Sequence, residues 1–298
     1  MGRRGEPPIR RLQNERSLVF LEPTVSPPSL PATRIRPPRG HAQRRTVFFD
    51  LLYILTWRDI KIRYKQSVMG MMWAIFMPAL IIGAGLLMRV VMGHVGGIKP
   101  NATDVASLAV KALPWAFLVT GLRFGTTSLA GNASLLTKIN VPRIVFPVSA
   151  VLSALFDLLV ATLPLIVILA LCGVRPTSAL AWAPLLLGLL VLFVTGLAIL
   201  FAVGNLFLRD VKYIVEVLLT FAIFFTPVLY DVAVLGDLGR WVLLNPVAPL
   251  LEGLSSVMVR GEMPSLGWTL YSAACSLGVV ALAWTIFARR EGVFADYV

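Results

Sequence analysis

The amino-acid sequence predicts an all-α integral membrane protein, in which six transmembrane helices follow an amphipathic interfacial helix. Of the 298 residues, 57% are hydrophobic and only 14% are charged, whereas a soluble domain carries about 25% charged residues. Several apolar runs exceed the roughly 18 residues that a helix needs to cross a bilayer. The short alternating segments of a membrane β-barrel are absent. The mean hydropathy of +0.82 agrees with a chain that has no separate soluble domain.

The first 45 residues differ in composition from the rest of the chain. They hold ten of the 27 basic residues and eight prolines, and such a segment cannot bury an apolar core. Their longest apolar run, Leu18 to Leu21, is too short for a signal peptide. We therefore expect residues 1–45 to form a disordered cytoplasmic tail that contacts anionic membrane lipid rather than nucleic acid.

Residues 46–298 form the predicted membrane domain, which begins with the interfacial helix at 46–65. Phe49, Tyr53, Trp57 and Tyr64 recur at helical spacing, and cations gather at the C-terminal end of this segment. Its apolar part is too short to cross a bilayer. The helix is therefore expected to lie in the headgroup region with its aromatic face toward the membrane.

Long stretches without charge predict the six spans. They cover residues 66–89, 113–136, 144–174, 176–208, 211–230 and 263–288. Between spans five and six the chain is apolar but interrupted by Asn245, Pro246, Pro249 and Glu252. We expect this segment to form short helices that re-enter the outer leaflet.

The distribution of cations predicts that both termini are cytoplasmic, because cytoplasmic loops carry an excess of Lys and Arg. Outside the tail, ten cations lie in the predicted inner segments and five in the outer ones. The inner cations are Arg58, Lys61, Arg63, Lys65, Lys138, Arg143, Arg209, Lys212, Arg289 and Arg290. The outer cations are Lys99, Lys111, Arg175, Arg240 and Arg260.

Two ionisable residues, Arg123 and Asp157, lie well inside predicted spans two and three. The two spans are antiparallel neighbours, and both residues fall near the middle of the membrane at a rise of about 1.5 Å per residue. Because a charge at that depth normally finds a partner, we predict that Arg123 and Asp157 form an ion pair. The pair acts either as a clamp between helices or directly in substrate passage.

The sequence predicts no catalytic or metal site. No nucleophile–base pair stands out, and His41, His94, Cys172 and Cys275 show no ligand spacing. The phosphate-binding motif GxxxxGK[ST] is missing, so the chain is not itself a P-loop ATPase.

Four segments resemble, in the same order, the membrane-spanning subunit of ABC-type polysaccharide and polyol-phosphate exporters, such as the O-antigen, capsule and teichoic acid permeases. The segments read "LTWRDIKIRYKQSVMGMMWAIFMPAL", "LPWAFLVTGLRFGTTSLAGNASLLTKINVPRIVFPVSAVLSALFDLLVA", "GNLFLRDVKYIVEVLLTFAIFFTPVLY" and "LNPVAPLLEGL". The resemblance runs from about residue 46 to 298, and the proline-rich tail departs from it. It implies a half-transporter: two copies form a pore that is driven by two copies of a separate ATPase subunit, which binds ATP and Mg²⁺.

The resemblance also implies roles for individual residues. The interfacial helix, the loop between spans two and three and the turn before span five are expected to contact the ATPase. These residues are Trp57, Arg58, Asp59, Lys61, Arg63, Lys65, Asn132, Leu135, Leu136, Lys138, Pro142, Arg209 and Asp210. Spans one and five are expected to line the substrate channel, through Trp73, Phe76, Phe221, Phe224, Phe225 and Tyr230.

The sequence thus predicts the homodimeric permease of an ABC exporter in a bacterial inner membrane, moving a lipid-linked polysaccharide out of the cytoplasm. One alternative is an ABC permease of the same architecture that exports a drug, an antibiotic or a small lipid. Two others are an intramembrane acyl- or glycosyltransferase, which would act without an ATPase, and a plain channel.

Overall fold

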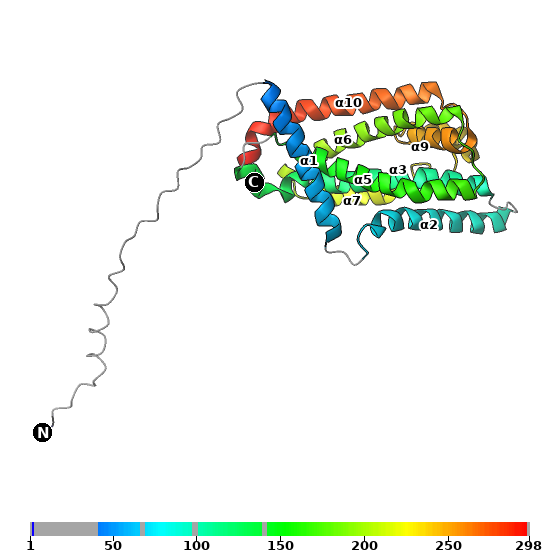
Figure 1. Ribbon diagram of the computed structural model, residues 1–298, viewed down its shortest axis with the longest axis horizontal. Coiled ribbons are helices and arrows are strands. Elements are labelled where there is room, and N and C mark those ends of the chain that lie inside the picture. The colour runs from blue at the N-terminus through cyan, green and yellow to red at the C-terminus, as the bar shows by residue number, and fades with distance from the viewer. Residues whose placement is uncertain (1, 3–40, 66–68, 97–100, 139–141, 297–298) are drawn as a thin grey trace. The chain divides into compact units, whose positions relative to one another are not determined.

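The computed structural model describes residues 2, 41–65, 69–96, 101–138 and 142–296, and within these ranges it is helical without strands. Figure 1 shows the long helices of residues 41–296 side by side, with α1 running obliquely across one end of the bundle. The helices, including short 3₁₀ and π segments labelled η, are α1 (His41–Lys65), α2 (Met72–Gly96), α3 (Ala102–Gly131), α4 (Ala133–Lys138), α5 (Val145–Leu171), η2 (Ser178–Trp182), α6 (Ala183–Phe207), α7 (Val211–Ala222), η3 (Val232–Leu238), α8 (Gly239–Val242), α9 (Ala248–Ser255), η4 (Ser256–Arg260), α10 (Leu266–Arg290) and η5 (Glu291–Asp296).

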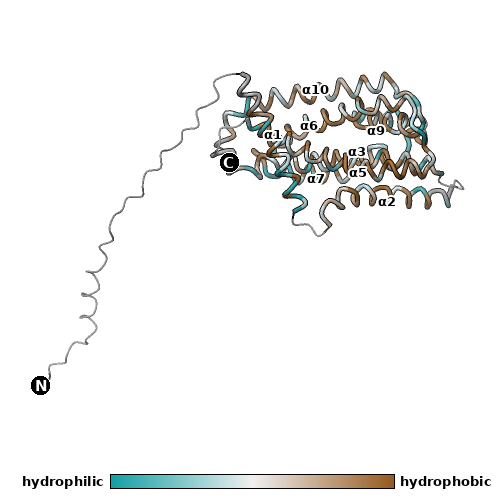
Figure 2. Tube along the Cα trace, in the orientation of Figure 1, coloured by the Kyte–Doolittle hydropathy of each residue, from teal (hydrophilic) through white to brown (hydrophobic). Residues whose placement is uncertain are grey.

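The bundle has two ends with different contents. The α1 end holds α1, α4, the turn between α6 and α7, and η5; the far end holds η3, α8, α9 and η4 (Figure 1). Hydrophobic residues dominate the middle of the long helices, whereas hydrophilic residues gather toward both ends (Figure 2). This banding is the pattern that a bilayer imposes on helices that cross it.

Five helical segments are long and apolar enough to cross a membrane, by length and composition. They are Met72–Val91, Ala102–Gly131, Val145–Leu171, Ser178–Phe207 and Leu266–Arg290. They correspond to predicted spans one, two, three, four and six, and the expectation of an all-α, multi-pass membrane protein is confirmed at this level.

The structure differs from the prediction at span five. Continuous helix covers only the 12 residues of α7, and the chain then continues in turns through Tyr230. The turns begin at Ile223, whose carbonyl would be the helical acceptor for the N–H that Pro227 lacks. Thr226 closes the end of the helix by donating its hydroxyl to the carbonyl of Ala222 at 2.8 Å.

Helix α3 begins at Ala102, eleven residues before the start of predicted span two. Asn101 and Asp104 form a capping box that stabilises this early start, since each side chain accepts a hydrogen bond from the backbone of the other. The prediction placed Lys111 in an outer loop. It lies inside α3 instead, where carboxylates from other segments neutralise it.

Helix α3 is also the central helix of the bundle, and it packs against α2, α5, α6, α7 and α9. Its contact with α6 is close at two glycines one turn apart, Gly121 and Gly125. A Cβ atom at Gly121 would lie 2.9 Å from a methyl group of Val194, and one at Gly125 would lie 2.6 Å from the Cβ of Ala198. The small-xxx-small pattern in "GLRFG" therefore marks a real helix–helix contact.

Gly125→Ala is expected to destabilise the protein by about 1–3 kcal/mol, because the added methyl group overpacks the contact with α6. The measurement is thermal unfolding of the purified protein in detergent. Gly188→Ala is the matched control, since a Cβ atom at that position of α6 meets nothing within 4 Å. Equal unfolding temperatures for the two variants would contradict the expectation.

Candidate functional site

A row of polar side chains joins α1 to α5, and we call it the α1–α5 seam. On α5 the row consists of Ser149, Ser153 and Asp157, which are spaced four residues apart and so share one helix face. Ser149 donates to a carboxylate oxygen of Asp59 at 3.2 Å, and Arg63 donates to the hydroxyl of Ser153 at 2.8 Å. Buried polar groups in such a row fix the relative position of two helices, because a shift would leave them without partners.

Asp157 receives two partners from the end of α1. Arg63 forms an ion pair with it, and the hydroxyl of Tyr64 donates to its other oxygen. Burial, reinforced by the hydrogen bond to Asp157, raises the pKa of Tyr64 well above its usual value. Tyr64 therefore keeps its proton and remains a donor to the carboxylate.

The predicted ion pair between Arg123 and Asp157 is wrong. Arg123 pairs with Glu216 of α7 through two contacts, at 2.9 Å from Nε and 2.5 Å from a terminal nitrogen. The physical reason is helix rotation: Arg123 lies on the face of α3 that meets α7, whereas Asp157 lies on the face of α5 that meets α1. Both residues nevertheless line one cavity of about 240 Å³, which α1, α2, α3 and α5 enclose.

Many residues predicted to contact an ATPase lie at the α1 end. Arg58 donates to its neighbour Asp59 at 2.8 Å and to Asn132 at 2.9 Å. Because Asn132 lies at the end of α3, the second hydrogen bond connects α1 to α3. The exposed members at this end are Trp57, Lys61, Lys65, Pro142, Arg209 and Asp210. The half-buried members are Arg58, Asp59, Arg63, Asn132 and Leu135. Leu136 and Lys138 lie in α4, but their side chains are outside the described residues.

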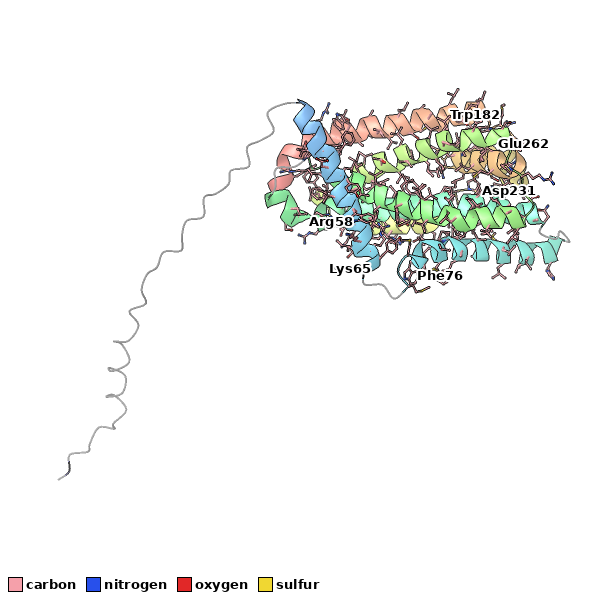
Figure 3. All side chains as sticks on the ribbon, viewed as in Figure 1. Arg58, Lys65, Phe76, Trp182, Asp231 and Glu262 are labelled. Atoms are coloured by element: carbon pink, nitrogen blue, oxygen red, sulfur yellow. The ribbon has the colours of Figure 1, made fainter. Side chains whose placement is uncertain are left out.

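Five of the six predicted channel residues are exposed. Trp73 and Phe76 on α2 form an edge-to-face pair with ring centroids 5.5 Å apart. Phe221 is exposed on α7, and Phe224 and Phe225 are exposed in the turns that follow. Tyr230 is half-buried, and its hydroxyl donates to the carbonyl of Phe224 at 3.1 Å. Figure 3 shows Phe76 near the start of α2, close to Lys65 at the end of α1.

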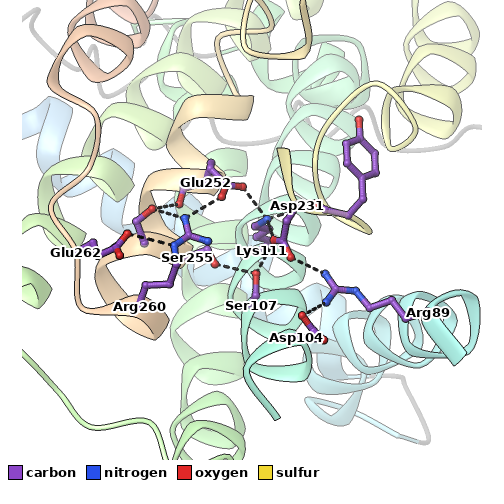
Figure 4. Close-up of polar contacts among 11 residues, drawn as sticks. Arg89, Asp104, Ser107, Lys111, Asp231, Glu252, Ser255, Arg260 and Glu262 are labelled. Atoms are coloured by element: carbon purple, nitrogen blue, oxygen red, sulfur yellow. Dashed lines mark hydrogen bonds and ion pairs between the residues drawn. The ribbon is translucent and has the colours of Figure 1, made fainter. Parts of the chain in front are cut away.

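A network of charged residues at the far end was missed by the sequence analysis. Its centre is Lys111, whose side chain is 0% exposed and whose Nζ lies 2.5 Å from Asp231 and 2.7 Å from Glu252 (Figure 4). Arg89 of α2 pairs with Asp104 at 3.0 Å and with Asp231 at 3.1 Å. The signal in the sequence was the presence of isolated charges in apolar stretches, since such charges are normally paired.

The far-end network holds together segments that are remote in sequence. Arg260 pairs with Glu252 at 2.8 Å, and Ser107 donates to Asp231 at 2.9 Å. Although burial opposes ionisation of Asp231, Lys111 and Arg89 hold the pKa of this carboxyl below its usual value. Asp231 therefore stays ionised at neutral pH, and the network joins α2, α3, η3 and α9.

Comparison with known proteins places this arrangement in a family. The model of the ABC-2 type transporter family matches residues 50–259. The chain is 30% identical, over 254 residues, to the O-antigen export system permease protein RfbA of Myxococcus xanthus, with 83% of this chain and 95% of the relative covered. It is equally identical to a protein of that name from Klebsiella pneumoniae over 260 residues, with the same coverage. The chain therefore belongs to the ABC-2 type transporter membrane family.

Proposed function

We propose that this protein is the permease subunit of an ABC exporter that moves a lipid-linked polysaccharide across the membrane. The observation that carries the proposal is the 30% identity to O-antigen export permeases, which covers 95% of their length. As a member of the ABC-2 type family the chain is a transport subunit rather than an enzyme. ATP and Mg²⁺ are bound by a separate ATPase subunit.

The α1 end is the cytoplasmic end in this proposal, and both termini are cytoplasmic. The cation excess at the inner segments supports this orientation, and so does the grouping of Trp57, Lys61, Lys65 and Arg209 on the exposed surface there. An ATPase that contacts α1 would act on α5 and α3 as well, because the α1–α5 seam and the Arg58–Asn132 hydrogen bond connect these helices.

Two copies of the chain form the channel, with α2 and α7 facing the shared space. The support is the unequal burial of α7, in which Val215 and Leu219 are buried, Val211 and Ala222 are half-buried and the other residues are exposed. Helix α2 is similarly peripheral, since its main contacts are with α3 and α5. Exposed aromatic rings on these helices suit a polymer that slides, because stacking on sugar rings needs no tight binding. The short helices η3, α8 and α9 close the outer side of the channel.

The proposal is tested by deleting the chain from its host and following the lipid-linked glycan. We expect the polymer to disappear from the cell surface while its lipid-linked form accumulates inside. The chain should also co-purify with the ATPase encoded beside it. Normal surface polymer after deletion would overturn the proposal, and loss of drug or small-lipid export instead would favour that alternative substrate class.

A further inference from the structure

One face of α3 is open even though α3 is the most enclosed of the long helices. Ala116, Thr120, Arg123, Thr127 and Ala130 are spaced alternately four and three residues apart, so they form a single stripe along the half of α3 nearest the α1 end. Every one of them is half-buried or exposed. We call this stripe the open face of α3.

The open face lies between the two helices assigned to the channel. Toward α2 it borders the 240 Å³ cavity, whose lining includes Trp73, Thr120 and Arg123. Toward α7 it is joined by the ion pair between Arg123 and Glu216. The residues at its two ends, Ala116 and Ala130, are small and leave the surface accessible.

The ion pair between Arg123 and Glu216 indicates what lies beside the open face of α3. The side chains of Arg123 and Glu216 are 49% and 47% exposed, although α3 and α7, on which they lie, are largely apolar helices. Arg123 lies about 12 Å from the end of α3, at a rise of about 1.5 Å per residue. Charged side chains within a bilayer face the bundle interior or a water-filled space rather than lipid tails. The exposed ion pair therefore argues against lipid tails beside the open face.

We propose that the open face of α3 is a third wall of the export channel, and that Arg123, Glu216 and Thr120 contact the hydroxyl groups of the moving polymer. This inference rests on the proposed function and adds a binding surface to it. Arginine supplies several N–H donors, glutamate supplies acceptors, and threonine supplies both. Sugar hydroxyls donate and accept, so they exchange readily along such a surface.

The charge of the open face and the size of the neighbouring cavity fit a polymer that carries hydroxyl groups. Arg123 and Glu216 neutralise each other, so the surface binds hydroxyl groups without trapping an anionic chain. The cavity beside them is smaller than the roughly 300–1,000 Å³ typical of sites that enclose a drug-sized ligand. It accommodates one ring-sized group at a time, and the indole of Trp73 in its lining offers a flat apolar surface for the ring.

Cysteine labelling tests whether the open face borders water. Thr120→Cys and Thr127→Cys are placed in a chain that carries Cys172→Ser and Cys275→Ser, and the complete transporter in membranes is treated with a charged methanethiosulfonate. We expect labelling on the order of 10-fold faster than at Leu277→Cys and Leu282→Cys, because the reactive thiolate forms only in water. Both control leucines are exposed on α10, one of the helices long and apolar enough to cross a membrane.

A second arm tests contact with the polymer. Labelling at Thr120→Cys is compared between cells that make the lipid-linked glycan and cells whose glycan synthesis is blocked, and we expect slower labelling when the polymer is present. Labelling as slow as at the leucine controls would overturn the inference, and would assign the face to lipid or to the second copy. Equal rates with and without polymer would overturn the polymer contact. If the chain proves dispensable for glycan export, the proposed function itself fails, whatever the labelling pattern.

Discussion

Lys111→Met is expected to lower the free energy of unfolding by about 3–5 kcal/mol, the usual cost of removing one partner from a buried charge cluster. Methionine preserves most of the volume of lysine, so the loss is electrostatic. Asp231 and Glu252 would remain beside each other without the cation that they share, and each would keep one arginine partner, Arg89 or Arg260. The measurement is thermal unfolding in detergent, where Tm should fall on the order of 10 °C.

Two further variants identify the cause of that loss. Lys65→Met is the matched control, because Lys65 is exposed at the end of α1 and lies outside the network; its Tm should change little. The triple variant Lys111→Met, Asp231→Asn, Glu252→Gln should recover part of the stability, since it removes the repulsion between the two carboxylates, while Arg89 and Arg260 keep Asp104 and Glu262 as partners. A Tm for Lys111→Met equal to that of the control would contradict the role assigned to the network.

The far-end network also explains how the segment between α7 and α10 is held without a long helix. Leu250, Leu251 and Leu254 of α9 are buried in the core of the bundle. Asp231 precedes α9 at the start of η3, Glu252 lies within α9, and both are bound to Lys111. Apolar burial places α9, and the shared lysine ties α9 to the chain at Asp231.

The sequence was sufficient for the features that depend on local composition. Five spans followed from apolar runs, because the length of an apolar run is a property of the segment alone. A helix was predicted at 46–65 and α1 covers His41–Lys65, again because its aromatic and charged residues are close in sequence. The limit of span five could not be read from Pro227 alone, because Pro78, Pro114 and Pro164 lie inside α2, α3 and α5 without ending them.

The ion-pair partners of the charged residues could not be predicted in the same way. The depth of Arg123 and Asp157 along their helices was estimated from residue counts, but the identity of a partner depends on how each helix is rotated about its axis. That rotation is set by packing between segments, such as the close contact of Gly125 with Ala198. Lys111 was assigned to a loop for a related reason: its two carboxylates come from residues more than 100 positions away.

Reversing either charge of the Arg63–Asp157 pair is expected to destabilise the permease by about 3 kcal/mol, the lower end of the range for buried pairs. The lower end applies because the side chains are 18% and 16% exposed. Arg63→Asp would place two carboxylates together at the seam, and Asp157→Arg would place two guanidinium groups there. Lys61→Glu is the control, since Lys61 is exposed on α1 and lies over Trp57 instead of facing α5.

The double variant Arg63→Asp, Asp157→Arg decides whether the pair itself accounts for that loss. If it does, the double variant should be more stable than the sum of the single losses predicts, which a double-mutant cycle on unfolding free energies measures directly. Recovery should be incomplete, because an aspartate at position 63 is too short to reach Ser153 and an arginine at position 157 cannot accept the proton of Tyr64. Additive losses would mean that α1 is held on α5 by its other contacts. A force applied to α1 would then reach α5 without passing through this pair.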